Sequence, residues 1–302
     1  MAIREEQAEV PSAVRKPRDD EIDVYGLTHP GKVRTENQDN FLVASLHRQM
    51  RVHLTSLPAL GGVQRDTDRL AFLAVVADGV GGGFAGEEAS RFALESMSQY
   101  VNDSATCFYT ADAGDDEAFR RTLESAALRV HEALNERSAA LPGRRGMATT
   151  LTLFLGVWPR IYLLQVGDSR YYFMRDGELT QVTRDQTIAQ ELIDLGVLTR
   201  TDQKVARFSN VLASAIGGAQ SSPVVTGVQN AWGMVHLLCS DGLTRHVDDA
   251  RIRERLLAMT SAREACEALL QDALDGGGRD NITVIVAHVS GEHDHTRVRG
   301  MQ

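Results

Sequence analysis

The chain has few cysteines, no excess of basic residues and no long apolar run. Three cysteines occur among 302 residues, and none of them belongs to a C-x-x-C pair. We therefore expect neither a disulfide framework nor a zinc site, and a reducing cytoplasm is the expected compartment. No apolar stretch approaches the roughly 20 residues that span a bilayer. The N-terminus also lacks the apolar segment of a signal peptide, so no signal peptide is expected. From both absences together, we expect no contact with a membrane.

Acidic residues outnumber basic ones. The sequence holds 41 Asp and Glu against 32 Lys and Arg, which gives a formal net charge of −9. This balance argues against binding of a nucleic-acid backbone, which requires clustered cations. It fits an acidic site that cations neutralise. The apolar fraction of 43% and the charged fraction of 24% are ordinary for a soluble globular protein.

The composition along the chain indicates one domain with two polar ends. Residues 1–22 mix charges of both signs with proline, and we expect a flexible N-terminal tail there. Residues 23–290 form the expected domain, and residues 291–302 a flexible C-terminal tail. Within the domain, the polar segment 183–218 is expected to be a lid-like insertion, and a rigid pair of surface helices is the alternative.

Apolar spacing predicts both strands and helices. Strands are expected at residues 24–28, 41–44, 70–77, 147–158, 161–170, 171–182 (as a hairpin), 224–229, 235–243 and 282–289. Helices are expected at residues 87–101, 116–139, 186–195, 248–259 and 262–274. The segment 47–69 is expected to be a loop excursion. Several strands follow one another through tight connections, which favours an antiparallel sheet.

The apolar run from Leu70 to Ala77 stops abruptly at Asp78-Gly79. An unbroken run of this length is typical of a strand that is buried on both faces. A carboxylate at the end of such a strand is costly to bury unless it is paired or ligates a metal. Asp78 is therefore a candidate metal ligand, and an ordinary Asp-Gly turn is the alternative.

The same pattern recurs at three other aspartates. Asp168 and Asp241 each follow an apolar strand, and Asp280 precedes one. In an antiparallel sheet, the end of one strand and the start of its neighbour can share an edge. Acids gathered there repel one another unless cations neutralise them, and carboxylate ligands suit Mg²⁺ or Mn²⁺. Arg34 could supply a forked donor for a phosphate oxygen beside such ions.

Six ordered segments extend this pattern across the chain, namely 34–40 (RTENQDN), 76–82 (VADGVGG), 148–150 (ATT), 167–170 (GDSR), 240–243 (SDGL) and 278–281 (GRDN). Together they resemble the signature of the metal-dependent (PPM, type 2C) Ser/Thr protein phosphatases in their bacterial form. The resemblance covers residues 23–290. It implies an α+β fold, a four-layer αββα sandwich of two antiparallel β-sheets flanked by helix pairs. It also implies that residues 183–218 form a flap beside the active site.

The resemblance assigns two Mn²⁺ or Mg²⁺ ions to the site and a ligand role to several residues. Asp78 would bridge the two ions, and Gly79 would offer its carbonyl. Asp241 and Asp280 would ligate the first ion. Asp39 would contact the site directly or through ion-bound water. Asp39 and Asp78 are thus expected to act in catalysis as well as in metal binding.

Other residues are expected to bind substrate or a third ion. Arg34 would bind the substrate phosphate, which makes it the third expected catalytic residue. Asp168 resembles the residue that, together with Asp241, holds a third and weaker ion in bacterial members. Ser209 and Asn210 of the insertion are candidates to reach that ion.

Two positions depart from the family pattern. Gln38 stands where many members carry a glutamate ligand, so the second ion would be held more through water. Val80 stands where eukaryotic members carry a histidine that is considered a general acid, so the leaving group would be protonated by ion-bound water or another group. Bacterial members share this pattern, and neither departure predicts inactivity.

The function implied by the resemblance is hydrolysis of phosphoserine and phosphothreonine in proteins by a metal-bridging water or hydroxide, without a phosphoenzyme. Expected partners are phosphorylated protein substrates and a cognate Ser/Thr kinase. One alternative is a catalytically inactive member of the fold that serves as a binding module. A structural protein whose Asp-Gly pairs are ordinary turns is the other.

Overall fold

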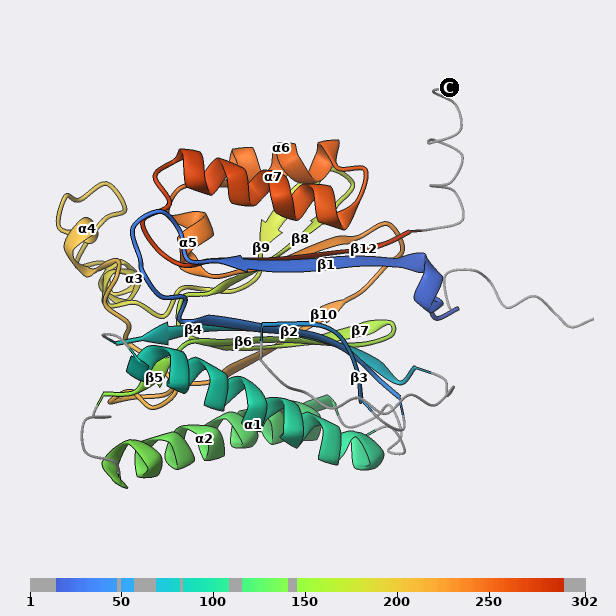
Figure 1. Cartoon of the computed structure of the whole chain (residues 1–302), viewed down its shortest axis with the longest axis horizontal. Coiled ribbons are helices and arrows are strands. Elements are labelled where there is room, and N and C mark those ends of the chain that lie inside the picture. The colour runs from blue at the N-terminus through green and yellow to red at the C-terminus, as the bar shows by residue number, and fades with distance from the viewer. Residues whose placement is uncertain are drawn as a thin grey trace, which may run out of the picture.

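Two antiparallel sheets pack face to face, and helices cover the outer face of each (Figure 1). The computed structural model describes residues 15–47, 50–56, 69–81, 84–108, 116–140 and 146–290. The four layers are the α+β sandwich that the family resemblance implies, so the expected fold class is confirmed. None of the helices within these ranges has the length and apolar character needed to cross a membrane.

The two sheets differ in size. The five-stranded sheet has the order β1 (Ile22–His29), β12 (Ile282–Val289), β11 (Val235–Cys239), β8 (Arg170–Arg175) and β9 (Glu178–Gln181). The seven-stranded sheet has the order β10 (Val224–Gln229), β7 (Arg160–Val166), β6 (Leu151–Val157), β4 (Ala71–Val80), β2 (Asp39–Leu46) and β3 (Met50–Thr55). Its seventh strand, the short β5 (Ala148–Thr149), pairs with the end of β4.

Helices form the two outer layers. The long helices α1 (Phe84–Phe108) and α2 (Asp116–Ala140) cover the seven-stranded sheet (Figure 1). On the other side, α6 (Asp249–Ala258) and α7 (Ala262–Asp275) cover the five-stranded sheet, beside the single turn α5 (Asp241–Thr244). The remaining helical elements are short, namely the 3-10 turn η1 (Asp19–Glu21), α3 (Ile188–Asp194) and α4 (Val205–Phe208).

Strand β4 shows why its sequence is an unbroken apolar run. Leu73 and Val75 point to the core between the seven-stranded sheet and its helices. Ala74 and Val76 point to the core between the two sheets. Both faces of the strand are therefore covered, and alternation with polar residues is not needed. The prediction of a doubly buried strand is confirmed.

Two segments depart from the sequence-based expectation. Residues 50–55 lie within the expected loop excursion, yet they form β3 and pair with β2. Residues 15–22 were expected to end a flexible tail, but they are tied to the domain. The amide of Ser290 donates to the carbonyl of Glu21 at 3.0 Å, Arg69 pairs with Asp19, and Ile22 already begins β1. The rest of the expected tails, residues 1–14 and 291–302, lies outside the described residues.

The insertion at 183–218 contains α3 and α4, and its two ends are joined. Thr187 and Leu212 form an isolated antiparallel bridge, and the amide of Ile188 donates to the carbonyl of Val211 at 2.8 Å. The amide of Gln186 donates to the carbonyl of Gly167, which follows β7. The insertion is thus a closed excursion with its base anchored beside Asp168.

Candidate metal centre

The central strand pair places two acids directly opposite each other. Asp39 is the first residue of β2, Asp78 lies near the end of β4, and the two are register partners in the antiparallel pair. Side chains of facing residues lie about 5 Å apart at their Cβ atoms. Asp39 is buried, with 2% of its surface exposed. Two carboxylates in such proximity need compensation from cations or protons.

The 148–150 segment fixes the backbone of Asp78. The carbonyl of Asp78 accepts from the amide of Thr150 and from the hydroxyl of Thr149, both at 2.8 Å. The amide of Asp78 donates to the hydroxyl of Thr150 at 3.0 Å. The two threonines therefore provide hydrogen-bond partners for both backbone groups of Asp78. In this way the segment 148–150 holds Asp78 in position.

Asp39 is held through one of its two oxygens. Its Oδ2 accepts hydrogen bonds from the hydroxyls of Ser240 and Thr283, both at 2.7 Å. Its Oδ1 is buried and has no hydrogen-bond partner among the described residues. Burial raises the pKa of Asp39 to about 6, against the lowering effect of the two hydroxyls. A buried carboxylate oxygen without a donor is a ready ligand for a cation.

Asp168 reaches the same region from the end of β7. The preceding Gly167 has a φ of +102°, and a side chain there would collide with Thr150, so only glycine fits. The hydroxyls of Ser169 and Thr150 are 2.9 Å apart, which ties this turn to the residue that holds the backbone of Asp78. Burial, followed by the charge of Asp185, raises the pKa of Asp168 to about 6.

Asp241 and Asp280 approach from β11 and from the turn before β12. Asp241 begins α5 and is buried, and its Oδ1 has no hydrogen-bond partner in the described part of the chain. Arg245, four residues later, pairs with Asp241. Arg245 also donates from Nη1 to Oδ2 of Asp280 at 2.8 Å. Arg34 donates to both oxygens of Asp280, at 3.0 and 3.2 Å.

The electrostatics show that these acids form one cluster. Burial raises the pKa of Asp78 well above its usual value, and the charges of Asp39, Asp241, Asp168 and Asp280 raise it further. Burial, and then the charge of Asp168, likewise raises the pKa of Asp241. Carboxylates distant in sequence thus converge at one end of the sandwich. The grouping of Asp78, Asp168, Asp241 and Asp280 at one edge is what antiparallel topology predicts.

An all-oxygen donor set at this position fits a hard divalent cation. The buried, unpartnered Oδ1 atoms of Asp39 and Asp241 need a positive partner, and carboxylates suit Mg²⁺ or Mn²⁺. Within the described ranges, no three acidic, His or Cys side chains are gathered closely enough to enclose one ion. Asp280, one of the expected ligands, is engaged by Arg34 and Arg245. The ligand roles expected for these residues remain predictions.

Glycine is required where Gly79 passes α1. A Cβ at Gly79 would collide with the carbonyl of Gly86 and would approach the carbonyl of Gln38. The amide group of Gln38 in turn lies against Gly86. The first turn of α1 therefore packs closely on the strand end that carries Asp78. Val80, which follows, is partly exposed at 38%.

Asn281 organises the loop that carries Arg34, a role that the sequence did not reveal. Its Nδ2 donates to the carbonyls of Pro30 and Glu36 at 3.1 and 2.8 Å. Its Oδ1 accepts from the amide of Gln38 at 2.8 Å. Arg245 was also missed, although its position four residues after Asp241 on a helical turn could have indicated the contact.

Comparison with known proteins places this chain in a family. A sequence model described as "Protein phosphatase 2C" matches residues 59–276. The serine/threonine protein phosphatase PstP of Mycobacterium tuberculosis is 36% identical over 219 residues, which are 72% of this chain. The match spans only 40% of PstP. The serine/threonine phosphatase stp of Listeria innocua is 29% identical over 262 residues, which are 86% of this chain and 92% of that protein.

A solved structure shows the same architecture. The catalytic domain of PstP, in complex with two manganese ions, superposes with a TM-score of 0.67 at 31% sequence identity. The match covers 89% of this chain and 99% of that domain. The layers of the sandwich thus have a counterpart in a protein domain solved in complex with manganese.

Proposed function

This chain belongs to the protein phosphatase 2C family, and from that membership we propose that it hydrolyses phosphoserine and phosphothreonine in proteins in a metal-dependent reaction. The observation that carries the proposal is the convergence of buried aspartates on one end of the sandwich, with Arg34 beside them. The named bacterial relatives are Ser/Thr phosphatases, which supports the same reaction class.

The metal is proposed to be Mn²⁺ or Mg²⁺, two ions per site. Asp78, Asp39, Asp241, Asp280 and the carbonyl of Gly79 would hold them. When bound, such ions supply an activated water and positive charge for displacement at phosphorus. The PstP domain in complex with two manganese ions supports manganese as the metal. A third ion, held by Asp168 with Asp241, is a further part of the proposal.

The chain's own residues bind and orient the phosphate. Arg34 is half exposed, at 55% for its side chain, and presents a planar fork that matches two phosphate oxygens. Its hydrogen bonds to Asp280 raise its pKa, so it stays charged. Asn281 holds the loop of Arg34 in place. Ser240 and Thr283 fix one oxygen of Asp39 and leave the other, which is buried, without a donor among the described residues.

Substitution of the aspartates tests the reaction. Asp78→Asn and Asp241→Asn should each reduce Mn²⁺-dependent hydrolysis of p-nitrophenyl phosphate and of phosphoserine and phosphothreonine peptides by at least about 10³-fold. Asp275→Asn, an exposed acid at the end of α7, is the matched control and should keep normal rates. Near-native rates in either site variant would refute the site assignment. A native chain that is inactive with both ions would favour the alternative of an inactive binding module.

The partners and the compartment follow from the same proposal. Phosphorylated proteins would be the substrates, and a Ser/Thr kinase that phosphorylates them would be the counterpart enzyme. The proposed place of action is the cytoplasm, which suits the low cysteine content and the two buried free thiols Cys239 and Cys266. Phosphoproteomics of a deletion strain complemented with the Asp241→Asn gene would identify the substrates.

A further inference from the structure

Four positive side chains gather along one side of the acidic cluster. Lys32 and Arg34 lie in the loop between β1 and β2, Arg245 follows the single turn α5, and Arg279 lies in the turn before β12. Arg34 and Arg245 both donate to the carboxylate of Asp280, and Figure 1 shows the β1–β2 loop beside α5. We call Lys32, Arg34, Arg245 and Arg279 the basic rim.

Backbone contacts, rather than charge, hold the loop against the turn. The amide of Lys32 donates to the carbonyl of Gly278 at 2.6 Å. Gly277 and Gly278 have φ values of +128° and +52°, which other residues rarely adopt. The amide of Arg279 donates to Nε2 of His246 at 3.1 Å. These contacts fix the points at which the side chains of Lys32 and Arg279 leave the backbone.

Two members of the rim, Lys32 and Arg279, are poorly neutralised. The ammonium group of Lys32 is 3.9 Å from Oδ1 of Asp275, and the two side chains are 54% and 66% exposed. An ion pair this exposed contributes little free energy. Arg279 is exposed, and its guanidinium group has no partner among the described residues. Both side chains can therefore pair with a charged ligand at little cost.

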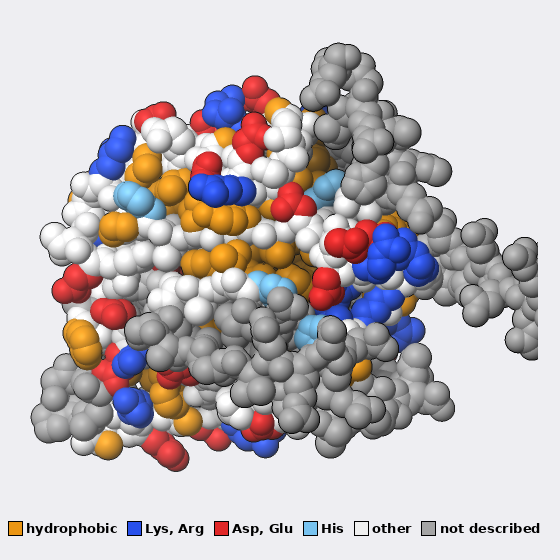
Figure 2. All heavy atoms as spheres, turned by 45° about the vertical axis from the view of Figure 1, so that its right-hand side comes forward, with side chains coloured by type: hydrophobic (Ala, Val, Ile, Leu, Met, Phe, Trp, Pro, Cys, Tyr) orange, Lys and Arg blue, Asp and Glu red, His pale blue; other side chains and the backbone are white. Residues whose placement is uncertain are grey.

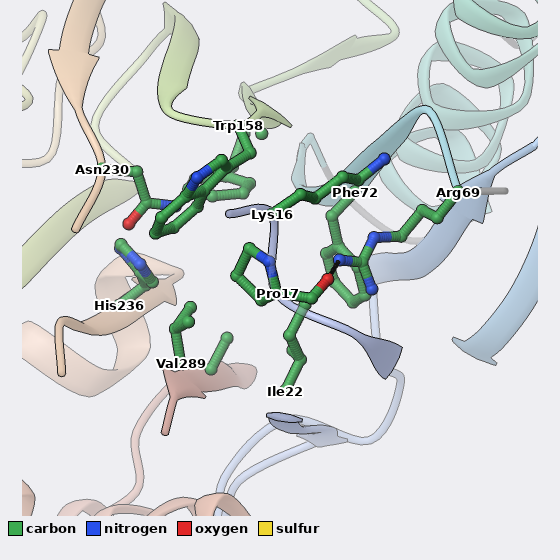
Figure 3. Close-up of a pocket in the computed structure, with 12 residues that line it drawn as sticks. Lys16, Pro17, Ile22, Arg69, Phe72, Trp158, Asn230, His236 and Val289 are labelled. Carbon is green, nitrogen blue, oxygen red and sulfur yellow. Dashed lines mark hydrogen bonds between the residues drawn. The ribbon is translucent and has the colours of Figure 1, made fainter. Parts of the chain in front are cut away.

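The other end of the sandwich is different. Figure 2 brings that end forward and shows acidic and basic side chains interspersed over the described part of the face. A cavity lies there, beside Phe72 at the start of β4. Its buried cation, Arg69, pairs with Asp19 and donates to the carbonyl of Pro17 (Figure 3). The chain as a whole carries a formal net charge of −9, so the positive charge of the rim is not a general property of the surface.

The position of the rim points to the neighbours of the phosphorylated residue in a substrate. In the proposed function, Arg34 binds the phosphate. Lys32 is two residues from Arg34 in the same loop, and Arg279 adjoins Asp280, to which Arg34 is bound. Side chains on either side of the phosphorylated residue would thus lie within reach of the long, flexible side chains of Lys32 and Arg279. Carboxylates at these places would be attracted, and positive side chains would be repelled.

We propose that the basic rim selects protein segments in which the phosphorylated serine or threonine has acidic neighbours, and that Lys32 and Arg279 pair with their carboxylates. This inference rests on the proposed phosphatase function, because it concerns the substrates of the same site. It adds a class of substrate, namely acidic phosphopeptides, and two residues that distinguish this class from others.

Three phosphothreonine peptides test the proposal. They are identical except that the residues on both sides of the phosphothreonine are Glu, Gln or Lys. Glu and Gln have nearly the same shape, so a difference between them reports charge. With the full chain and Mn²⁺, we expect kcat/KM to be about fivefold higher for the Glu peptide than for the Gln peptide, mainly through KM, and lowest for the Lys peptide. This preference should shrink as salt is raised from about 0.05 M to about 0.5 M, because exposed charges are then screened.

A double variant tests the two residues. Lys32→Gln combined with Arg279→Gln keeps the backbone hydrogen bonds to Gly278 and His246. The ratio of kcat/KM between the Glu and Gln peptides should fall to about 1 in this variant, because the paired cations are gone. Arg121→Gln combined with Arg263→Gln is the matched control. It removes the same charge from exposed positions on the outer helices α2 and α7, and the ratio should be retained.

The outcomes separate this inference from the proposed function. Hydrolysis of all three peptides with equal kcat/KM would overturn the inference and leave the phosphatase function standing. An equal fall of the ratio in both double variants would overturn it as well, because net charge alone would then explain the preference.

Hydrolysis of none of the peptides would refute the proposed function, and binding would then test the rim by itself. Fluorescence anisotropy of the same peptides, labelled at one end, measures their affinity for the chain with Mn²⁺. Tighter binding of the Glu peptide, lost in the variant of Lys32 and Arg279 and kept in the control, would support the rim as an acidic-peptide site. Equal binding of the three peptides would exclude it.

Discussion

Arg245 donates a hydrogen bond to Asp280 across 2.8 Å and, through the same guanidinium group, pairs with Asp241. Both aspartates are proposed metal ligands. The guanidinium group of Arg245 therefore binds carboxylates that a metal ion would also bind. Removing one member of a buried ion pair leaves the other charge uncompensated. Arg245 therefore balances the acidic cluster and competes with divalent ions for it.

Replacement of Arg245 should change metal affinity and metal-free stability in opposite directions. Arg245→Ala is expected to bind Mn²⁺ several-fold more tightly, measured by isothermal titration calorimetry, because the competing cation is gone. Its melting temperature in EDTA should fall, because the acids then repel without compensation. Arg279→Ala, which removes an exposed arginine beside Asp280, is the control. Weaker Mn²⁺ binding in Arg245→Ala would show that Arg245 supports the metal site instead.

The raised pKa of Asp39 predicts a cost to stability at neutral pH. Its folded pKa of about 6 lies above the value of roughly 3.9 for an unfolded chain, so the folded state binds more protons between these limits. The contribution of Asp39 to stability is therefore most favourable below pH 4 and is lost as pH rises through 6. The difference corresponds to about 3 kcal/mol.

Asp39→Asn should consequently raise the melting temperature of the metal-free protein at pH 7, by several degrees. At pH 4 the variant and the native chain should melt at similar temperatures. The asparagine keeps an acceptor for Ser240 and Thr283, so the gain is not offset by loss of both hydrogen bonds. Equal melting temperatures at pH 7 would contradict the raised pKa. Scanning calorimetry across this pH range is the measurement.

The affinity for divalent ions should depend on pH, because the acids that would bind them must first lose their protons. Asp39 and Asp168 both have a pKa of about 6, so below that pH a proton competes with the metal at each. The apparent affinity for Mn²⁺ is expected to rise steeply between pH 5 and pH 7, as these two carboxyl groups lose their protons. Titration calorimetry in buffers of different ionisation enthalpy should also detect proton release on binding. A pH-independent affinity would show that protons do not compete with Mn²⁺ at Asp39 and Asp168.

Thr150 is expected to matter through the backbone of Asp78. Thr150→Val keeps the shape but leaves the amide of Asp78 without its acceptor, which should cost about 1–3 kcal/mol of folding free energy. Chemical denaturation measures the loss. Thr226→Val, at a half-buried position in the middle of β10, is the matched control and should be close to neutral. Equal losses in the two variants would mean that the hydrogen bond to Asp78 is unimportant.

Asn281→Ala should impair the loop that presents Arg34. The substitution removes the donors to the carbonyls of Pro30 and Glu36 and the acceptor for the amide of Gln38. Misplacement of a positioning group by about 1 Å can reduce kcat/KM by about 10²-fold. We expect this loss with a raised KM for phosphopeptides, whereas Mn²⁺ affinity changes little. A variant with unchanged KM would show that the loop is held by other contacts.

Much of the fold was readable from the sequence because the strands are apolar and bounded by turns. The run 70–77 predicted a central strand buried on both faces, and the acids at strand ends predicted one shared edge. Strand β3 was missed because its residues, MRVHLT, alternate too weakly to stand out within a long polar excursion. Its pairing depends on the neighbouring β2, which local sequence does not report.

The contacts that complete the site were less visible. Asn281 acts on three backbone groups that are more than 240 residues away, and no local pattern reveals such a contact. Residues 15–22 have the composition of a tail, yet the pairing of Arg69 with Asp19 and the hydrogen bond from Ser290 to Glu21 fasten them to the sandwich. Polar residues of this kind become structural only through partners supplied by the tertiary fold.

The facing positions of Asp39 and Asp78 tie chemistry to strand alignment. A slip of β2 by one residue against β4 would turn Asp39 to the opposite face and bring apolar side chains into the wrong layer. The hydrophobic cost of that error protects the geometry of the acids. The core thereby protects the proposed metal-binding end against register errors, because a chain that keeps this alignment keeps positions 39 and 78 opposite each other.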